Sequence, residues 1–155
     1  MTDLGKRLQR LSGLEYRLRR RLAGPVINGP RGRLRVGVNV GLSDVLINTS
    51  GGSVDIGDCV FFGHDVLLLT GTHDYRLQGL ARQRILDTTA RSIHIGAGVW
   101  IASRVVVIGP CQIGANSVIG CGCVIDFDVP ANMIVRLSQD VSKREIRYTG
   151  VDNGD

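Results

Sequence analysis

The chain contains three histidines, and an imidazole is the side chain best suited to take a proton from a substrate near neutral pH. His73 stands in the run LLTGTHDYR, where a regular apolar pattern gives way to an unpatterned segment that extends to Ser92. Long segments of this kind within a compact repeat are usually functional. His64 falls in a turn-like run and His94 between two isoleucines, which indicates a solvated turn residue and an outward-facing strand residue. His73 is therefore the first candidate for a catalytic base.

The residues that must position His73 follow a period of six. From Ile95 to Pro130 the chain reads IGAGVW, IASRVV, VIGPCQ, IGANSV, IGCGCV and IDFDVP, with an aliphatic first place and only Val, Cys or Ser in the fifth. Helices repeat at 3.6 and simple strands at 2, so a period of six indicates a short strand followed by a corner. Three faces make one coil, and residues eighteen apart, such as Ile101 and Ile119 or Val105 and Cys123, should lie above one another. The sequence predicts an all-β fold, a parallel β-helix of hexapeptide repeats, in preference to a sandwich of short strands.

The rest of the chain divides around this repeat. Residues 1–24 predict a basic amphipathic helix with one leucine face, and residues 25–134 the β-helix. The six-residue blocks before the loop are IGDCVF, FGHDVL and LLTGTH, with Val60, Val66 and Thr72 expected to point inward. The first places 56 and 95 differ by 39, which is not a multiple of six, so we expect a protruding loop over 71–92. Residues 135–155 read as a polar tail. The glycines in the second places supply backbone freedom for the corners.

The formal charge is +5 and the isoelectric point about 9.4. Such a balance suits nucleic acid, an anionic membrane or a phosphorylated substrate, but the sequence carries no nucleic-acid-binding motif. The basic helix either caps the open end of the β-helix or, through residues 4–22, associates with a membrane surface. We find no apolar run typical of a signal peptide or a membrane span, and expect a cytoplasmic protein, with the inner face of the membrane as the alternative. The four cysteines are expected to be free thiols.

Metal binding is not indicated. The γ-class carbonic anhydrases share the β-helix and bind metal with three histidines, two of them in a close His-x4-His pair. Here the three histidines are spaced 9 and 21 residues apart. We therefore expect no metal site.

Residues 34–134 resemble the hexapeptide-repeat sugar O-acetyltransferases, which include the capsular-polysaccharide, maltose and galactoside acetyltransferases. The likeness is carried by NTSGGSVDIGDCVFFGHDVLLLTGTHDYR and, after the loop, by IHIGAGVWIASRVVVIGPCQIGANSVIGCGCVIDFDVP. The resemblance implies left-handed coils, a homotrimer with active sites between subunits, and acetyl-CoA as the acyl donor to a sugar or glycan hydroxyl. In that family the histidine of the T-G-x-H segment is the general base, and it corresponds to His73.

The same resemblance implies a cofactor groove. Trp100 matches the family's tryptophan on that groove, and Ser103 and Cys121 match positions whose backbone meets the cofactor, with Gly120 allowing close approach. The tetrahedral oxyanion would be held by a backbone N–H near Ala102 or Ser103. The lysine that relatives carry before the final proline is missing, so Arg144, or the neighbouring lysine, would meet the phosphates of CoA.

The substrate side of the site is expected to contain Asp44, Asn48, Asp74, Tyr75 and Arg76. His73 needs an orienting partner, and Asp44, Asn48 or a main-chain carbonyl could each serve, since Asp74 would point the other way in an extended chain. Two other functions stay open. An N-acetyltransferase of a nucleotide-linked amino sugar would use the same base and groove, with loop arginines meeting a diphosphate. A non-catalytic β-helix scaffold would explain why the lysine that relatives carry before the final proline is missing.

Overall fold

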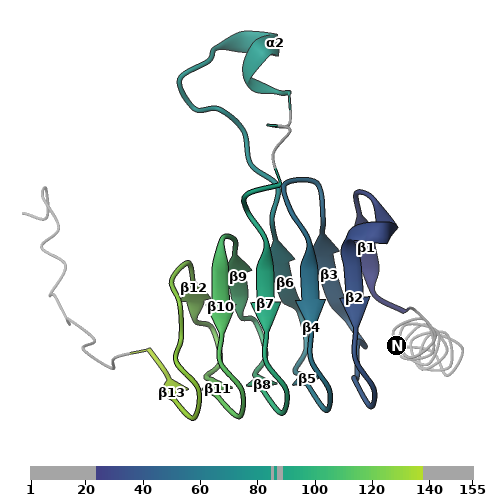
Figure 1. The fold of residues 1–155 in the computed structure, drawn as a ribbon. Coiled ribbons are helices and arrows are strands. Elements are labelled where there is room, and N and C mark those ends of the chain that lie inside the picture. The colour runs from purple at the N-terminus through teal and green to yellow at the C-terminus, as the bar shows by residue number, and fades with distance from the viewer. Residues whose placement is uncertain (1–23, 85, 87–88, 138–155) are drawn as a thin grey trace, which may run out of the picture.

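The computed structural model describes residues 24–84, 86 and 89–137. The predicted N-terminal helix and most of the predicted tail, including Arg144, lie outside these residues. The described chain is a parallel β-helix, as the period of six predicts, with three sheets forming the faces of a prism (Figure 1). Strands within each sheet pair in parallel.

The three sheets take one strand in turn from each coil. Sheet A contains β1 (Val26–Asn28), β3 (Val45–Asn48), β6 (Val66–Leu69), β9 (Val106–Ile108) and β12 (Val124–Ile125). Sheet B contains β2 (Leu34–Val36), β4 (Val54–Ile56), β7 (Ile93–Ile95) and β10 (Cys111–Ile113). Sheet C contains β5 (Phe61–Phe62), β8 (Trp100–Ile101), β11 (Val118–Ile119) and β13 (Ile134–Val135). A short 3-10 turn, η1 (Arg31–Arg33), precedes β2, and α2 (Gly79–Arg82) lies in the loop.

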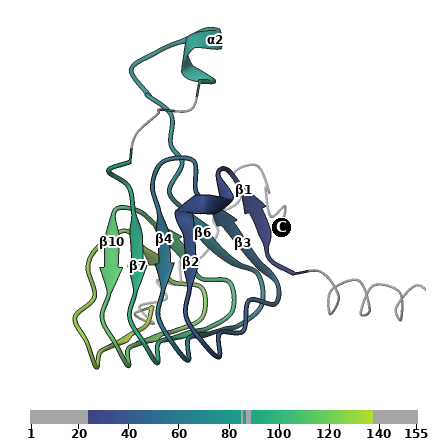
Figure 2. The same cartoon turned by 45° about the vertical axis from the view of Figure 1, so that its right-hand side comes forward.

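The register explains the break in the six-residue phase. After the loop, Ile101 pairs with Ile119 in the next coil, as the repeat predicts. Across the loop, Ile56 pairs with Ile95, a step more than twice as long. The insertion is therefore longer than one whole coil; it leaves the prism between β6 and β7 and stands above it (Figures 1 and 2). At the other end, β13 pairs with β11, so the β-helix extends to Val135, just beyond the predicted boundary.

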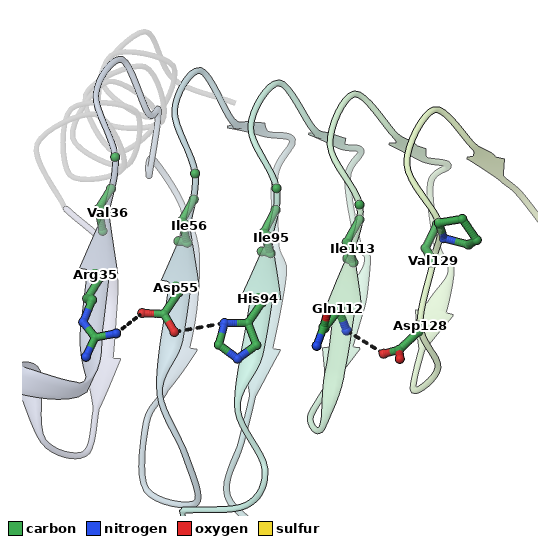
Figure 3. A pocket seen from close by; sticks show the side chains of 15 residues that line it. Arg35, Val36, Asp55, Ile56, His94, Ile95, Gln112, Ile113, Asp128 and Val129 are labelled. Atoms are coloured by element: carbon green, nitrogen blue, oxygen red, sulfur yellow. Dashed lines mark hydrogen bonds and ion pairs between the residues drawn. The ribbon is translucent and has the colours of Figure 1, made fainter.

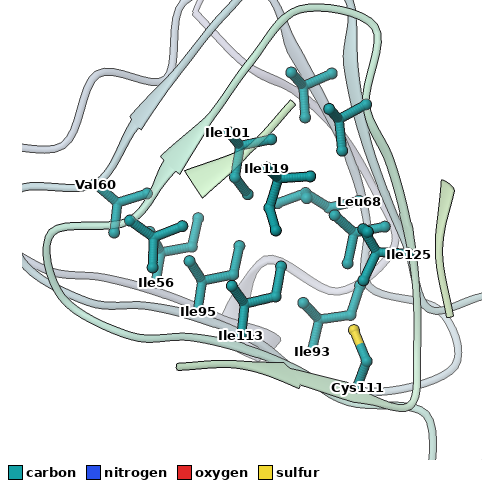
Figure 4. Close-up of a cluster of buried hydrophobic side chains, with 14 of the residues drawn as sticks. Ile56, Val60, Leu68, Ile93, Ile95, Ile101, Cys111, Ile113, Ile119 and Ile125 are labelled. Carbon is teal, nitrogen blue, oxygen red and sulfur yellow. The ribbon is translucent and has the colours of Figure 1, made fainter. Parts of the chain in front are cut away.

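The core is a column of aliphatic side chains inside the prism (Figure 4). Every first-place and fifth-place residue of the six blocks after the loop is buried. Cys111 and Cys123 lie in this core, whereas Cys59 and Cys121 are exposed, and all four are free thiols as expected. Thr72, predicted to point inward, is only half-buried; Thr70 is fully buried instead, because the chain leaves the coil directly after it.

Two of the three corners are built from residues with positive φ. Asp44, Asp65, Arg104 and Gly122 adopt it just before consecutive strands of sheet A. The second-place glycines have a different role from the predicted one, because several have ordinary φ values. A Cβ on Gly96 would lie 2.5 Å from the backbone nitrogen of Ala115 in the next coil. Glycine at that place therefore permits close stacking of coils.

Candidate functional site

His73 stands at the foot of the inserted loop, shortly after the end of β6. Its ring is held by the loop itself: Nδ1 lies 3.1 Å from the carbonyl oxygen of Arg84. A carbonyl can only accept, so this contact requires the proton on Nδ1 and leaves Nε2 with its lone pair. Of the orienting partners considered from the sequence, the main-chain carbonyl is the one found. In the neutral tautomer that this contact selects, Nε2 is the ring nitrogen that can accept a proton.

Asn48 secures the foot of the loop. Its Oδ1 accepts hydrogen bonds from the Ser50 N–H at 2.9 Å, the Ser50 hydroxyl at 2.6 Å and the Gly71 N–H at 3.0 Å. Beside it, Arg91 donates from Nε to the carbonyl oxygen of Thr70 at 3.0 Å, which ties the outgoing strand to the returning one. These contacts account for Asn48 as a residue that positions the segment leading to His73.

The structure does not bring Asp44 to His73. Asp44 precedes β3 and so lies at the far end of sheet A from the loop, about 13 Å away along the strand. There its Oδ2 is 3.4 Å from Nδ1 of His64 and accepts from the Asp65 N–H at 3.4 Å. Asp44, one of the three orienting partners considered, therefore does not reach His73 within one chain, because the strands of sheet A separate the two corners.

Asp74 and Arg76 engage each other. The Arg76 guanidinium donates from Nε to Oδ1 of Asp74 at 2.9 Å and from Nη2 to Oδ2 at 2.8 Å, and the Arg76 backbone N–H adds a third bond to Oδ1 at 3.0 Å. These donors lower the pKa of Asp74 to about 2. Tyr75, between them, is 82% exposed. The three predicted substrate residues thus form a short turn outside the foot of the loop.

A hollow of about 460 Å³ lies beside His73 and is lined also by Gly79, Arg82 and Gln83. A larger one, of about 970 Å³, covers the outer face of sheet B (Figure 3). That face carries a polar row in which His94 Nδ1 lies 3.1 Å from Asp55 Oδ2, so His94 is outward as predicted. The smaller hollow contains the candidate base.

The predicted cofactor residues gather at the corner where sheet C meets sheet A. Trp100 is 43% exposed on the outer face of β8 and stacks on Phe61, with ring centroids 5.7 Å apart. Ser103 follows at the corner, where its Oγ accepts from the His64 N–H at 3.0 Å. Gly122 donates its N–H to the Ser103 carbonyl at 3.1 Å, which places exposed Cys121 in the same corner. An apolar shelf beside open backbone fits the pantetheine arm of CoA.

Ala102 cannot hold the oxyanion. Its N–H donates to the carbonyl oxygen of Ile119 at 2.9 Å and is consumed by coil stacking. The N–H of Ser103, the other residue considered, makes no such backbone bond within the described part of the chain. Ser103 is therefore the remaining candidate for the backbone donor to the oxyanion. Arg104 is an exposed cation at the same corner, and sequence reasoning did not single it out because it stands inside a repeat block.

Within one chain the two halves of the candidate site are apart. His73 lies beyond the end of β6, whereas Ser103, Arg104 and Cys121 lie at the corner where strands of sheet A begin. Within a single described chain, the base therefore lies beyond the C-terminal ends of the sheet A strands, and the cofactor corner lies at their N-terminal ends. Among the described residues, no group of three or more His, Cys, Asp or Glu side chains is arranged to hold a metal ion. No helix within the described ranges is long and apolar enough to cross a membrane.

Residues 92–126 match the family model described as bacterial transferase hexapeptide (six repeats), on the same coils that the structure shows. The match to this hexapeptide-repeat model covers less than a quarter of the chain. This hexapeptide-repeat chain is 32% identical over 95 residues to a galactoside O-acetyltransferase of Lactococcus lactis, covering 59% of the chain and 42% of that protein. It is 33% identical over 105 residues to the galactoside O-acetyltransferase of Escherichia coli, covering 62% and 48%. The chain thus spans about half the length of these curated relatives.

Solved structures agree on the fold. A hexapeptide-repeat acetyltransferase from Vibrio cholerae, crystallised in complex with acetyl coenzyme A, superposes with a TM-score of 0.57 at 25% identity, covering 79% of this chain and 71% of that one. A maltose O-acetyltransferase from Clostridium difficile gives a TM-score of 0.53 at 27% identity, covering 71% and 59%. The hexapeptide-repeat chain is therefore similar to acetyltransferases in both sequence and structure.

Proposed function

We propose that this chain is an acetyl-CoA-dependent O-acetyltransferase that acts on a sugar or glycan hydroxyl, with His73 as the general base. The observation that carries the proposal is the hydrogen bond from His73 Nδ1 to the Arg84 carbonyl, which leaves Nε2 free to accept a proton. The similarity to galactoside and maltose O-acetyltransferases supports the reaction class and the acyl donor.

The chemistry asked of the chain is a single proton relay. A sugar hydroxyl is a weak nucleophile at neutral pH, so Nε2 of His73 takes its proton as the oxygen attacks the acetyl thioester carbon. The Ser103 N–H is the proposed donor to the resulting oxyanion. When the carbon–sulfur bond breaks, the imidazolium returns the proton to the departing thiolate. The ester, CoA thiol and neutral His73 are the products, and no covalent acyl-enzyme is required.

The separation of the two half-sites supports a homotrimer in which His73 of one chain meets the cofactor corner of the next. The outer faces of sheets A and C suit such contact, because both carry apolar rows. On sheet C, Phe61, Trp100 and Ile134 are 50%, 43% and 71% exposed; on sheet A, Val26 and Val124 are 56% and 54% exposed. Exposed apolar rows of this kind mark interaction surfaces.

The first test is His73→Ala with acetyl-CoA and a panel of sugar acceptors, followed by thiol release. We expect kcat to fall by roughly 10²–10⁴, because one general base contributes about that much. Binding of acetyl-CoA should persist, and a ligand at 100 times its Kd adds about 2.7 kcal/mol to the free energy of unfolding in both proteins. Unchanged turnover in the variant would remove His73 from its role. No thermal shift of the wild type at millimolar CoA would favour the scaffold.

A further inference from the structure

Three of the four described arginines of the loop, Arg76, Arg82 and Arg91, differ in what occupies their guanidinium groups. Arg76 is paired with the Asp74 carboxylate. Arg91 bonds to the carbonyl of Thr70 at the foot of the loop and ties the two strands together. Arg82 is in a third situation, since it lines the hollow that also contains His73. It is therefore the loop cation placed to meet whatever His73 deprotonates.

Arg82 is held in position by neutral groups. Its Nε donates to the carbonyl oxygen of Leu77, and its Nη2 donates to the carbonyl oxygen of Tyr75 at 3.2 Å. A guanidinium has five N–H donors, so these two bonds fix its plane and leave three donors. Carbonyl groups do not neutralise the charge, and no carboxylate pairs with Arg82 among the described residues. The guanidinium is therefore pre-oriented by two neutral carbonyl groups.

The side chains that line the hollow offer more hydrogen-bond donors than acceptors. Sugar hydroxyls need acceptors as well as donors, and a guanidinium can only donate. The acidic side chain that follows His73, Asp74, already receives three hydrogen bonds from Arg76. Among the side chains that line the hollow, the acceptors are the amide oxygen of Gln83 and a ring nitrogen of His73. A fixed fork of donors instead matches a carboxylate or a phosphate.

We propose that Arg82 binds an anionic group on the acceptor and makes a negatively charged sugar, carrying a carboxylate or a phosphate, the preferred substrate. This inference rests on the proposed function, because it takes the hydroxyl that reacts at His73 to belong to that acceptor. Arg82 acts as a specificity-determining residue: it binds the anion, while His73 takes the proton. Because both line one hollow, the charged group is carried by the reacting sugar or by a substituent directly on it.

The test compares three acceptors that share the galactose ring: galactose, galacturonate and galactose 6-phosphate. With acetyl-CoA saturating, we expect the wild type to show a kcat/KM about 10-fold to 100-fold higher for one or both charged sugars, the range for a hydrogen-bonded charge. The two charged acceptors separate a carboxylate from a phosphate preference. The advantage should shrink between 0.02 and 0.5 M NaCl, since an exposed cation is screened.

Arg82→Gln should remove the advantage, mainly through KM of the charged acceptor, and leave galactose within about threefold of the wild type. Arg31→Gln is the matched control, because it deletes one exposed cation in η1 and should preserve the advantage. A wild type that prefers galactose, or an Arg82→Gln variant that keeps the charged-sugar advantage, would overturn the inference.

A binding measurement distinguishes failure of the proposed acetyl transfer from failure of the proposed anion binding by Arg82. If none of the sugars is acetylated, calorimetric titration of galacturonate, galactose 6-phosphate and galactose into the acetyl-CoA-loaded protein still measures the role of Arg82. Tighter binding of a charged sugar that disappears in Arg82→Gln would support anion recognition without transfer. Equal affinity of the wild type and the Arg82→Gln variant for the charged sugars would overturn the proposed anion binding.

Discussion

At the scale of single residues, the four thiols provide a chemical probe of the proposed cofactor corner. Cys59 and Cys121 are exposed at corners of the prism, whereas Cys111 and Cys123 are buried. Burial, reinforced by Asp128 and Asp126, raises the pKa of Cys111 to about 11, so this thiol is not expected to react at pH 8. The exposed pair therefore supplies one probe inside the corner and one control outside it.

We predict that CoA slows alkylation of Cys121 by iodoacetamide at least about fivefold while leaving Cys59 unchanged, because a bound cofactor covers only the first. The measurement is peptide mass spectrometry over time, with desulfo-CoA used so that the ligand itself does not consume the reagent. Equal protection of both thiols would indicate a general stabilisation. Absence of protection at Cys121 at saturating ligand would remove it from the cofactor corner.

The Asp74–Arg76 pair makes a prediction about pH. The folded-state pKa of Asp74 is about 2, below its ordinary value of 3.8, so the pair's contribution is present above pH 3.8 and is lost as pH falls toward 2. Carboxyl-carbon NMR of the folded protein should give a midpoint near 2, and Arg76→Gln should return it toward 3.8. A wild-type midpoint already near 3.8 would show that the pair does not form in solution.

The residue scale also shows what a sequence can and cannot locate. His73 could be singled out because it stands where a repeat breaks, and that signal is local. Its partner could not, because the Arg84 carbonyl is a backbone group 11 residues away that only the path of the loop brings near. Asp44 carries a suitable carboxylate, but it lies at the opposite end of the sheet A strands from His73. The sequence alone does not show this separation, because it depends on how the coils stack.

At the scale of elements, the foot of the loop depends on one buried hydroxyl. Thr70 is fully buried; its Oγ1 donates to the Asn48 carbonyl at 2.8 Å and accepts from the Gly51 N–H at 3.1 Å. We predict that Thr70→Val lowers the free energy of unfolding by about 1–3 kcal/mol, because it leaves a buried N–H and a buried carbonyl with poorer partners. Urea titration followed by circular dichroism measures the change.

Thr72→Val is the control for this substitution. Thr72 is half-buried, and its side chain makes no hydrogen bond within the described residues, so the change should stay within about 0.5 kcal/mol. Equal losses in the two variants would show that the buried hydroxyl of Thr70 contributes no more to stability than the half-buried hydroxyl of Thr72.

The elements themselves were largely predictable, since a period of six has few structural solutions and the inward column repeats it. The corners were less so. Asn and Asp are expected with positive φ, but Arg104 and Cys59 adopt it as well because the stacked corner imposes that conformation on each coil. The phase shift across the loop indicated an insertion. The break in the pattern placed this insertion at residues 71–92, and the strand register shows that it adds somewhat more than one coil.

At the scale of the whole molecule, the three outer faces of the prism differ in character. Sheet B presents Arg35, Asp55, His94 and Gln112 in one polar row (Figure 3). Asp55 joins two of its neighbours, through an ion pair with Arg35 and a contact with the His94 ring, each of 3.1 Å. Sheets A and C present apolar rows instead. The six-residue pattern predicts which residues point inward, but it does not predict which outward residues share a face. The difference between the polar face and the two apolar faces is therefore seen only in the stacked coils. It identifies A and C as the faces available for contact between chains.

The proposed trimer makes a stringent prediction about sites shared between chains. His73→Ala removes the base, and Cys121→Trp blocks the cofactor corner at an exposed position that tolerates a larger side chain. If each site combines His73 of one chain with the corner of the next, random mixing of the two inactive variants restores about a quarter of the wild-type activity, since one pairing in four joins two intact halves. Light scattering should give three times 16.7 kDa. Co-expression with two tags and native mass spectrometry confirm that mixed trimers form; mixed trimers without recovered activity would place both halves of the site in one chain.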